Sequence, residues 1–125
     1  MSETAEVVLS LPADGAFTHV LRATTAALAA RADFSIDEVD DLRIAAAEAG
    51  AIAVRHAAPS AQLTCTFTLA AARVDLVVEV PTAGTVEVDR DSFGWQVLAA
   101  LADADAEATR DRLRLLLHAT STLET

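Results

Sequence analysis

The sequence predicts a two-layer α/β (α+β) sandwich, in which a mixed, mostly antiparallel sheet packs under three helices. The segments with the apolar spacing of amphipathic helices are near residues 15–32, 35–59 and 92–104. Residues 62–70 and 73–81 alternate apolar and polar side chains, as half-buried strands do, and a short turn separates them. They predict a hairpin at the centre of the sheet. Residues 1–125 are assigned to a single domain, which is long enough to bury a hydrophobic core.

The predicted central helix follows Ser35. Glu38 stands three residues later, so the pair predicts a capping box, and Pro59 ends the helix. One face is rich in alanine, which allows the helix to lie close to the sheet: Val39, Leu42, Ala46, Ala49, Ala53 and Ala57. The opposite stripe contains Asp41, Ile44, Glu48, Ile52 and Arg55.

Glu48 is the unusual residue of this helix, because it is a lone carboxylate among alanines and Ile52. It has two interpretations. The first is a solvated side chain in a good helix, since glutamate is seldom fully buried. The second is a present or former catalytic carboxylate.

Residues 5–11 predict an edge strand, and Asp14 is placed to cap the first helix. The apolar face expected for that helix is Phe17, Val20, Leu21, Thr24 and Leu28. The tail can be read as helix or strand. We interpret it as a hairpin of residues 107–110 and 112–120, with its arginines on the solvent side or paired with acidic residues.

Composition excludes several classes of function. The net charge of −10 argues against nucleic acid or an anionic membrane as a partner and favours a basic protein surface. Cys65 is the only cysteine and is expected to be a buried apolar residue, so no internal disulfide or thiolate metal cluster is expected. The histidines are scattered, and we predict no metal site. No apolar run is long enough to span a membrane, and the N-terminus lacks a basic leader, so cytoplasmic localisation is expected.

The run D-L-R-I-A-A-A-E-A-G-A-I-A-V-R-H-A, residues 41–57, resembles the first motif of the RsbW-type anti-sigma factors and serine kinases, which belong to the GHKL (histidine kinase-like ATPase) superfamily. In that family the motif glutamate is the general base for serine phosphorylation, and a following asparagine holds the magnesium of Mg-ATP. Glu48 corresponds to the glutamate. Ile52 stands at the asparagine position and offers no oxygen ligand to magnesium.

The resemblance continues in two further motifs. The run V-P-T-A-G, residues 80–84, lies where the family has its adenine-binding aspartate and glycines, and it retains Gly84. The run S-F-G-W-Q-V-L-A-A-L-A-D, residues 92–103, is similar to the last motif of the actinobacterial branch and retains Gly94, with Trp95 after it. Trp95 is expected to cap the core, to fill the nucleotide pocket or to mark a partner surface. Only the short, acidic residues 85–91 stand where an ATP lid belongs.

The resemblance implies a GHKL-like fold and a regulator that sequesters a sigma factor until an anti-anti-sigma (STAS) protein competes. It also implies a homodimer and a sigma contact at Arg22 of the first helix. Because the ATP motifs are degenerate, with Glu48, Gly84 and Gly94 the surviving positions, a pseudokinase without cofactor is expected. The alternatives are an active ATP-dependent serine kinase using Glu48 and an altered magnesium site, and a scaffolding domain with another partner. A serine hydrolase is disfavoured, since no Gly-x-Ser-x-Gly turn is present.

Overall fold

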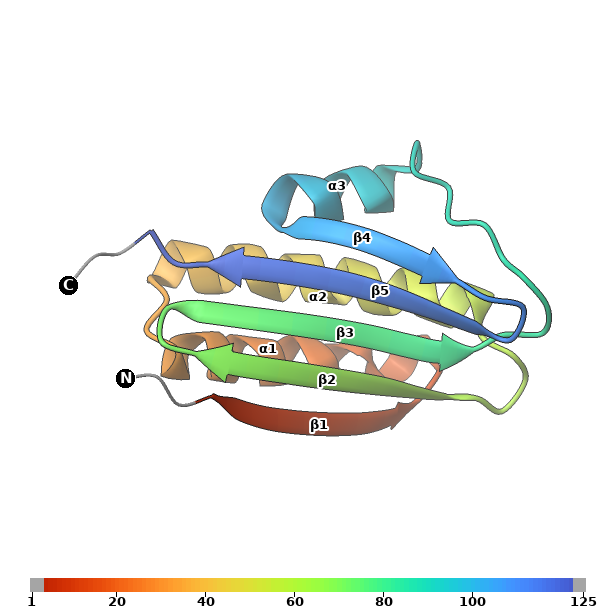
Figure 1. Ribbon diagram of the computed structural model, residues 1–125, viewed down its shortest axis with the longest axis horizontal. Helices are drawn as coiled ribbons and strands as arrows, with labels where there is room; N and C mark the ends of the chain where they lie inside the picture. Colours follow the sequence, from red (N-terminus) through yellow and green to blue (C-terminus); the bar gives the residue numbers. More distant parts are fainter. Residues whose placement is uncertain (1–3, 123–125) are drawn as a thin grey trace.

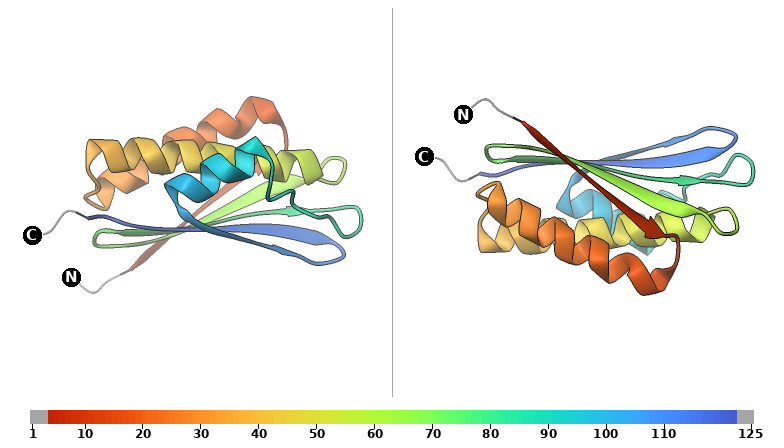
Figure 2. Two further views of the ribbon diagram at one scale, coloured as in Figure 1. Left: turned by 90° about the horizontal axis from the view of Figure 1, so that it is seen from above. Right: turned by 90° about the horizontal axis from the view of Figure 1, so that it is seen from below.

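The computed structural model describes residues 4–122, which form one five-stranded sheet with helices on one side (Figures 1 and 2). The strand order is β1-β2-β3-β5-β4. The strands are β1 (Ala5–Pro12), β2 (Gln62–Ala70), β3 (Arg73–Pro81), β4 (Asp103–Ala108) and β5 (Arg112–Thr120). The β2–β3 hairpin is internal and β1 lies at an edge, as the sequence predicts.

All neighbouring strands pair antiparallel, so the expectation of a mixed sheet is wrong. Connectivity explains the difference. Two helices separate β1 from β2, and α3 followed by β4 separates β3 from β5. Each of these connections contains two elements that run in opposite directions, so the chain re-enters the sheet antiparallel to the strand it left.

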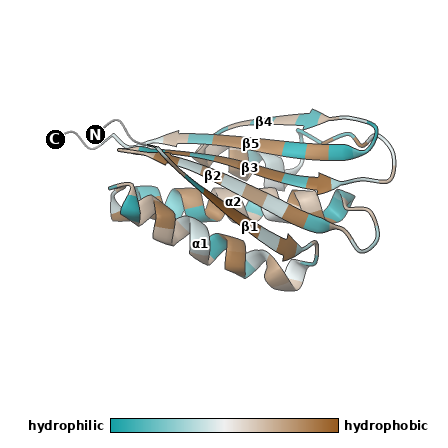
Figure 3. Cartoon of the chain, turned by 60° about the horizontal axis from the view of Figure 1, so that its bottom comes forward, coloured by the Kyte–Doolittle hydropathy of each residue, from teal (hydrophilic) through white to brown (hydrophobic). Residues whose placement is uncertain are grey.

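The helical layer consists of a 3₁₀ turn η1 (Gly15–Phe17), α1 (Thr18–Arg31), α2 (Ile36–His56) and α3 (Phe93–Leu101). α2 packs against both α1 and α3, and thus lies in the middle of the layer (Figure 2). Gly50 allows α1 to approach closely, because a Cβ there would lie 3.1 Å from Cδ2 of Leu21. In Figure 3, apolar and polar residues are interspersed along helices and strands, as expected for elements with one buried face.

A single hydrophobic cluster fills the space between the layers. β2, β3 and most of β5 bury every second side chain, which confirms their predicted alternation. Cys65 is fully buried, and this burial raises the pKa of its thiol to about 12. The thiol therefore stays protonated near neutral pH and serves as an apolar core residue.

Four boundaries differ from the sequence-based expectations, one of them at α2, which ends at His56 and not near Pro59, because Ala57 is already extended. The first helix begins as a 3₁₀ turn, whose cap is Asp14, and its buried residues are Leu21, Thr25 and Ala29. The third helix ends at Leu101 instead of continuing to residue 104. The chain then enters β4 at Asp103, four residues before the predicted hairpin, because Ala102 is already extended and the Asp-Ala alternation pairs with β5.

The arginines of β5 pair with acidic side chains on the open face of the sheet, as expected. Arg112 contacts Glu79 at 3.0 Å, and Arg114 contacts Glu107 at 3.1 Å. Such exposed pairs contribute ~0–1 kcal/mol each. They mainly keep this face of the sheet polar.

The N-terminal end of α2 is closed by hydrogen bonds. The capping box is present: the Ser35 hydroxyl accepts from the Glu38 N–H at 3.2 Å, and the Ser35 N–H donates to the Glu38 carboxylate at 2.8 Å. The same carboxylate also accepts from the Ser121 hydroxyl at 2.8 Å and from the Thr122 N–H at 2.7 Å. Glu38 thus joins the helix start to the chain that follows β5.

The prediction that Ile52 lies on an outer stripe of α2, away from the core, is wrong. Its side chain is 1% exposed and belongs to the core, whereas Ile44 on the same stripe is exposed. The reason is that α3 packs along this side of α2 and covers it. Trp95 of α3, 6% exposed, is likewise a core residue.

Candidate functional site

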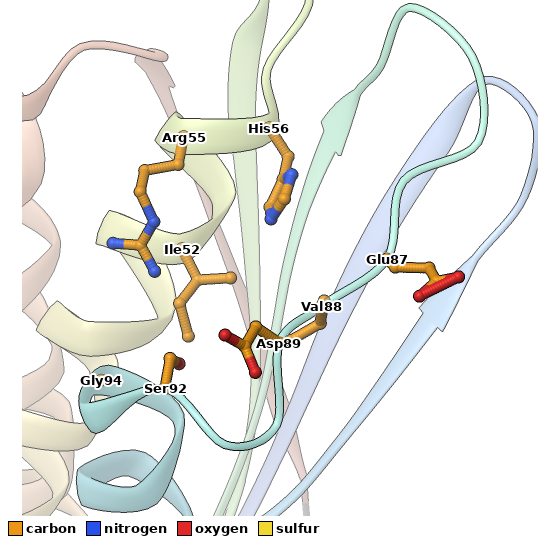
Figure 4. Close-up of a pocket in the computed structure, with 8 residues that line it drawn as sticks. All are labelled: Ile52, Arg55, His56, Glu87, Val88, Asp89, Ser92 and Gly94. Carbon is orange, nitrogen blue, oxygen red and sulfur yellow. The ribbon is translucent and has the colours of Figure 1, made fainter.

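A cavity of about 390 Å³ opens at the C-terminal end of α2 (Figure 4). Three groups of residues line it, from α2, from the loop after β3, and from the start of α3. They are Ile52, Arg55 and His56, then Glu87, Val88 and Asp89, and finally Ser92 and Gly94. The cavity therefore lies where the helical layer meets the irregular segment of residues 82–92.

The α2 wall of the cavity combines an apolar floor with a basic rim. The methyl groups of Ile52 are packed in the core, so they present a small apolar surface. Arg55 and His56 follow one helical turn later and point toward the cavity. Within residues 4–122 neither side chain makes a hydrogen bond or an ion pair. The Arg55 guanidinium and the His56 ring are therefore available to a ligand.

The loop wall is fixed by turns within residues 82–92. Asp89 accepts a hydrogen bond from the Asp91 N–H at 2.9 Å through its carboxylate, and its carbonyl accepts from the Ser92 N–H at 3.1 Å. The remaining carboxylate oxygen of Asp89 faces the cavity, whereas the Glu87 carboxylate turns away from it (Figure 4). Asp89 is thus the acidic group presented to a ligand.

Arg90 holds this loop against the body of the fold. Its guanidinium lies 4.7 Å from the ring centroid of Trp95, and it donates to the Ala106 carbonyl at 3.4 Å and to Asp105 at 3.5 Å. A cation over an indole is stabilised by ~0.5–1 kcal/mol at an exposed site. Arg90 therefore connects the loop to both α3 and β4.

The start of α3 completes the cavity. Ser92 caps the helix, accepting from the Trp95 N–H at 3.2 Å. A Cβ added to Gly94 would lie 2.9 Å from Oε1 of Glu48 and 4.0 Å from Nη2 of Arg55. A side chain at this position would shift the flexible end of Glu48, so Gly94 leaves room for the Glu48 carboxylate beside the start of α3.

The structure brings together three of the residues singled out in the sequence. Glu48, half-buried, approaches Gly94 beside the cavity, and Ile52 forms its floor. Gly84 does not line it: this residue is exposed and has φ +92° in the turn after β3, where Thr82 donates to its carbonyl at 2.8 Å. Arg22 is exposed on α1, which packs on the other side of α2.

Sequence reasoning did not place Arg55, His56 and Asp89 in the site. The sequence places Arg55 only on the outer stripe of the central helix, and His56 only within the run of residues 41–57. A signal was present, because Arg55 follows Glu48 by seven residues and must share its helix face. Asp89 had no comparable signal, since it lies in an irregular loop whose path depends on the stacking of Arg90 on Trp95.

A cavity with an apolar floor and a polar rim suits a ligand that has an apolar part and a polar end.

Among residues 4–122, no His, Cys, Asp and Glu side chains gather in a group that could hold a metal ion. The same part of the chain contains no helix that is long and apolar enough to cross a membrane. Comparison with protein-family models gives no match, and neither does comparison with curated proteins.

Proposed function

We propose that this protein is an RsbW-like regulator of GHKL type that sequesters a sigma factor and no longer uses ATP. An anti-anti-sigma (STAS) protein would release the sigma factor by competing for the regulator. The antiparallel sheet under three helices is compatible with this family, and so is the position of Glu48 beside the start of α3. Arg22, exposed on α1, is the proposed sigma contact on that helix. We propose a cytoplasmic homodimer as the working form.

The observation that carries the loss of ATP use is the burial of Ile52. At 1% exposure its side chain fills the floor of the cavity, in the position where the resemblance places the magnesium-binding asparagine. Magnesium binds oxygen ligands and keeps several waters in ideal octahedral geometry. A packed isoleucine provides neither an oxygen nor room for those waters.

The charge of the cavity supports the same conclusion. Asp89 points into the space, so phosphate groups would meet its carboxylate. Phosphoryl transfer needs metal ions and cationic groups around the γ-phosphate. Arg55 is the one arginine among the residues that line the cavity, and Glu48 without a bound phosphoryl donor has no proton to accept from an attacking serine.

The net charge of −10 supports a basic protein as partner. Complementary charge between two proteins raises the rate of association and disfavours wrong partners. A basic surface of a sigma factor satisfies this requirement, whereas a nucleic acid would be repelled.

Two measurements test the proposal. First, the purified protein is titrated with ATP, with and without Mg²⁺, by calorimetry, and we expect no heat up to millimolar ATP. Magnesium-dependent binding followed by phosphorylation of a STAS protein would instead establish the kinase alternative.

Second, sigma factors from the same genome are purified and tested for complex formation by size-exclusion chromatography. We expect one to bind, and the absence of any complex would refute sigma sequestration.

A further inference from the structure

The cavity has a cation on one wall and a carboxylate on the other. Arg55 and His56 point into it from α2, and the Asp89 carboxylate points into it from the loop after β3 (Figure 4). Within residues 4–122 neither Arg55 nor Asp89 makes an ion pair, although Glu48 lies on the same side of α2 as Arg55. The described part of the chain therefore leaves both charges to a ligand.

Arg55 and Asp89 are also too far apart to form an ion pair with each other. In Figure 4 the Ile52 side chain lies between the two charged groups. The space that they share is about 390 Å³. This volume is at the small end of the ~300–1,000 Å³ that is typical of ligand sites. A single small molecule can therefore reach both groups.

The two charges disfavour a ligand that carries charge of one sign only. A simple anion would be attracted by Arg55 and repelled by Asp89, and a simple cation would meet the reverse. A molecule with both a carboxylate and an ammonium group satisfies the two walls together. An arginine can donate two parallel hydrogen bonds to a carboxylate, and an ammonium group can donate to the carboxylate of an aspartate.

The floor of the cavity favours a ligand with an apolar portion. Ile52 belongs to the core and Val88 packs against it, and both line the cavity. Methylene groups on this surface are removed from water, and each buried methylene contributes ~0.8 kcal/mol. The lining thus matches three parts of an amino acid: a carboxylate, an ammonium group and a short hydrocarbon chain.

We propose that the cavity binds a small zwitterionic amino acid, with its carboxylate on Arg55, its ammonium group on Asp89 and its methylene groups on Ile52. His56 and Ser92 line the same space and can add hydrogen bonds to the carboxylate. The inference goes beyond the proposed binding of a sigma factor, because it assigns a small-molecule ligand to the cavity that no longer serves ATP.

The first experiment follows binding by the ¹⁵N amide signals of the purified protein. Norvaline and δ-aminovalerate are isomers, with the ammonium group next to the carboxylate in the first and at the far end of the chain in the second. We expect saturable shifts of the Ser92 and Gly94 signals with at least one isomer, and the tighter one gives the spacing that the cavity accepts. Valerate lacks the ammonium group, pentylamine lacks the carboxylate and glycine lacks the hydrocarbon chain, so each should bind at least tenfold more weakly.

The second experiment removes each charge of the cavity in turn. Arg55→Gln and Asp89→Asn should each weaken binding of the preferred isomer about tenfold, which corresponds to loss of a charge-assisted hydrogen bond. Asparagine keeps a side-chain oxygen that can accept from the Asp91 N–H, so the turn is preserved. Arg43→Gln is the matched control on the same helix and should leave binding unchanged, because Arg43 pairs with Asp40 and does not line the cavity.

The two variants should also change the preference of the cavity in opposite directions. Asp89→Asn should strengthen binding of valerate, because a repulsive charge is lost, and Arg55→Gln should strengthen binding of pentylamine for the same reason. Folding of each variant is checked from the dispersion of the same spectra.

The proposal would be overturned if neither isomer gave a saturable shift, or if valerate or pentylamine bound as tightly as the better isomer. Unchanged affinity in Arg55→Gln or in Asp89→Asn would also overturn it. None of these titrations uses a sigma factor, so failure of this inference and failure of the proposed function are observed separately.

Discussion

At the N-terminal end of α2 the Glu38 carboxylate accepts four hydrogen bonds, from Ser35, Ser121 and both the N–H and hydroxyl of Thr122. At the C-terminal end, Arg55 and His56 make no hydrogen bond or ion pair within the described residues and face an open cavity. One end of the helix joins three parts of the chain, and the other leaves the side chains of Arg55 and His56 without a hydrogen-bonded partner within residues 4–122. The first end therefore contributes to stability, and the second end is the one that is open to a ligand.

The largest expected effect on stability is at Ile52, which forms the floor of the cavity at the C-terminal end of α2 and is buried in the core. Ile52→Ala should lower the free energy of unfolding by about 2–5 kcal/mol, because a buried methyl-rich side chain is lost and a cavity remains. Denaturant unfolding followed by the fluorescence of Trp95, the only tryptophan, measures this change. Ile44→Ala on the same helix is the control and should change stability by less than about 1 kcal/mol, since Ile44 is 39% exposed. If Ile52→Ala also changes the free energy of unfolding by less than about 1 kcal/mol, the side chain that forms the cavity floor is not part of the core.

The next largest expected effect is on the pH dependence of stability, through Glu38 at the N-terminal end of α2. The backbone N–H of Thr122, then that of Ser35 and the Ser121 hydroxyl, lower the pKa of Glu38 from 4.5 to about 2. A lowered folded-state pKa means that the contribution is fully present above pH 4.5 and is lost as the pH falls toward 2. Glu38→Gln should therefore lower stability at pH 7 and flatten the loss of stability between pH 4.5 and 2.

Chemical denaturation across this pH range measures the effect, and Asp37→Asn is the matched control. Asp37 lies one residue earlier in the same first turn but is exposed and does not contact residues 121 and 122. If Asp37→Asn flattens the profile as much as Glu38→Gln, the general acidity of the first turn explains the profile, and the Glu38 contacts do not.

A smaller effect compares the two serine caps, Ser35 at the start of α2 and Ser92 at the start of α3. Ser35→Ala should cost about 1 kcal/mol, and more than Ser92→Ala, because Ser35 acts in a reciprocal capping box. Ser92 caps α3 without one, since position 95 is tryptophan. Equal losses, measured by urea unfolding of both variants, would show that the reciprocal hydrogen bond adds no stability.

The capping box at the N-terminal end of α2 could be predicted from the sequence, and the cavity at its C-terminal end could not. The Ser35–Glu38 spacing is a local pattern, and the alternation of residues 62–70 and 73–81 reports directly which face is buried. By contrast, Ile52 looked like a residue of the outer stripe, because only the packing of α3 decides that it is covered. The cavity depends on contacts between segments far apart in the sequence, such as Gly94 with Glu48, 46 residues earlier, for which one sequence holds no signal. The contacts of Glu38 with residues 121 and 122 were missed for the same reason.

The smallest expected effect on stability is at Arg55, at the C-terminal end of α2. Arg55→Gln should change the free energy of unfolding by less than about 0.5 kcal/mol, because the guanidinium has no hydrogen-bonded or ionic partner within residues 4–122 to lose. Arg112→Gln is the informative comparison, since it breaks the 3.0 Å contact with Glu79 and should cost up to ~1 kcal/mol. A larger loss for Arg55 than for Arg112, measured by urea unfolding, would mean that Arg55 supports the fold. In that case the charges at the C-terminal end of α2 could no longer be assigned to recognition.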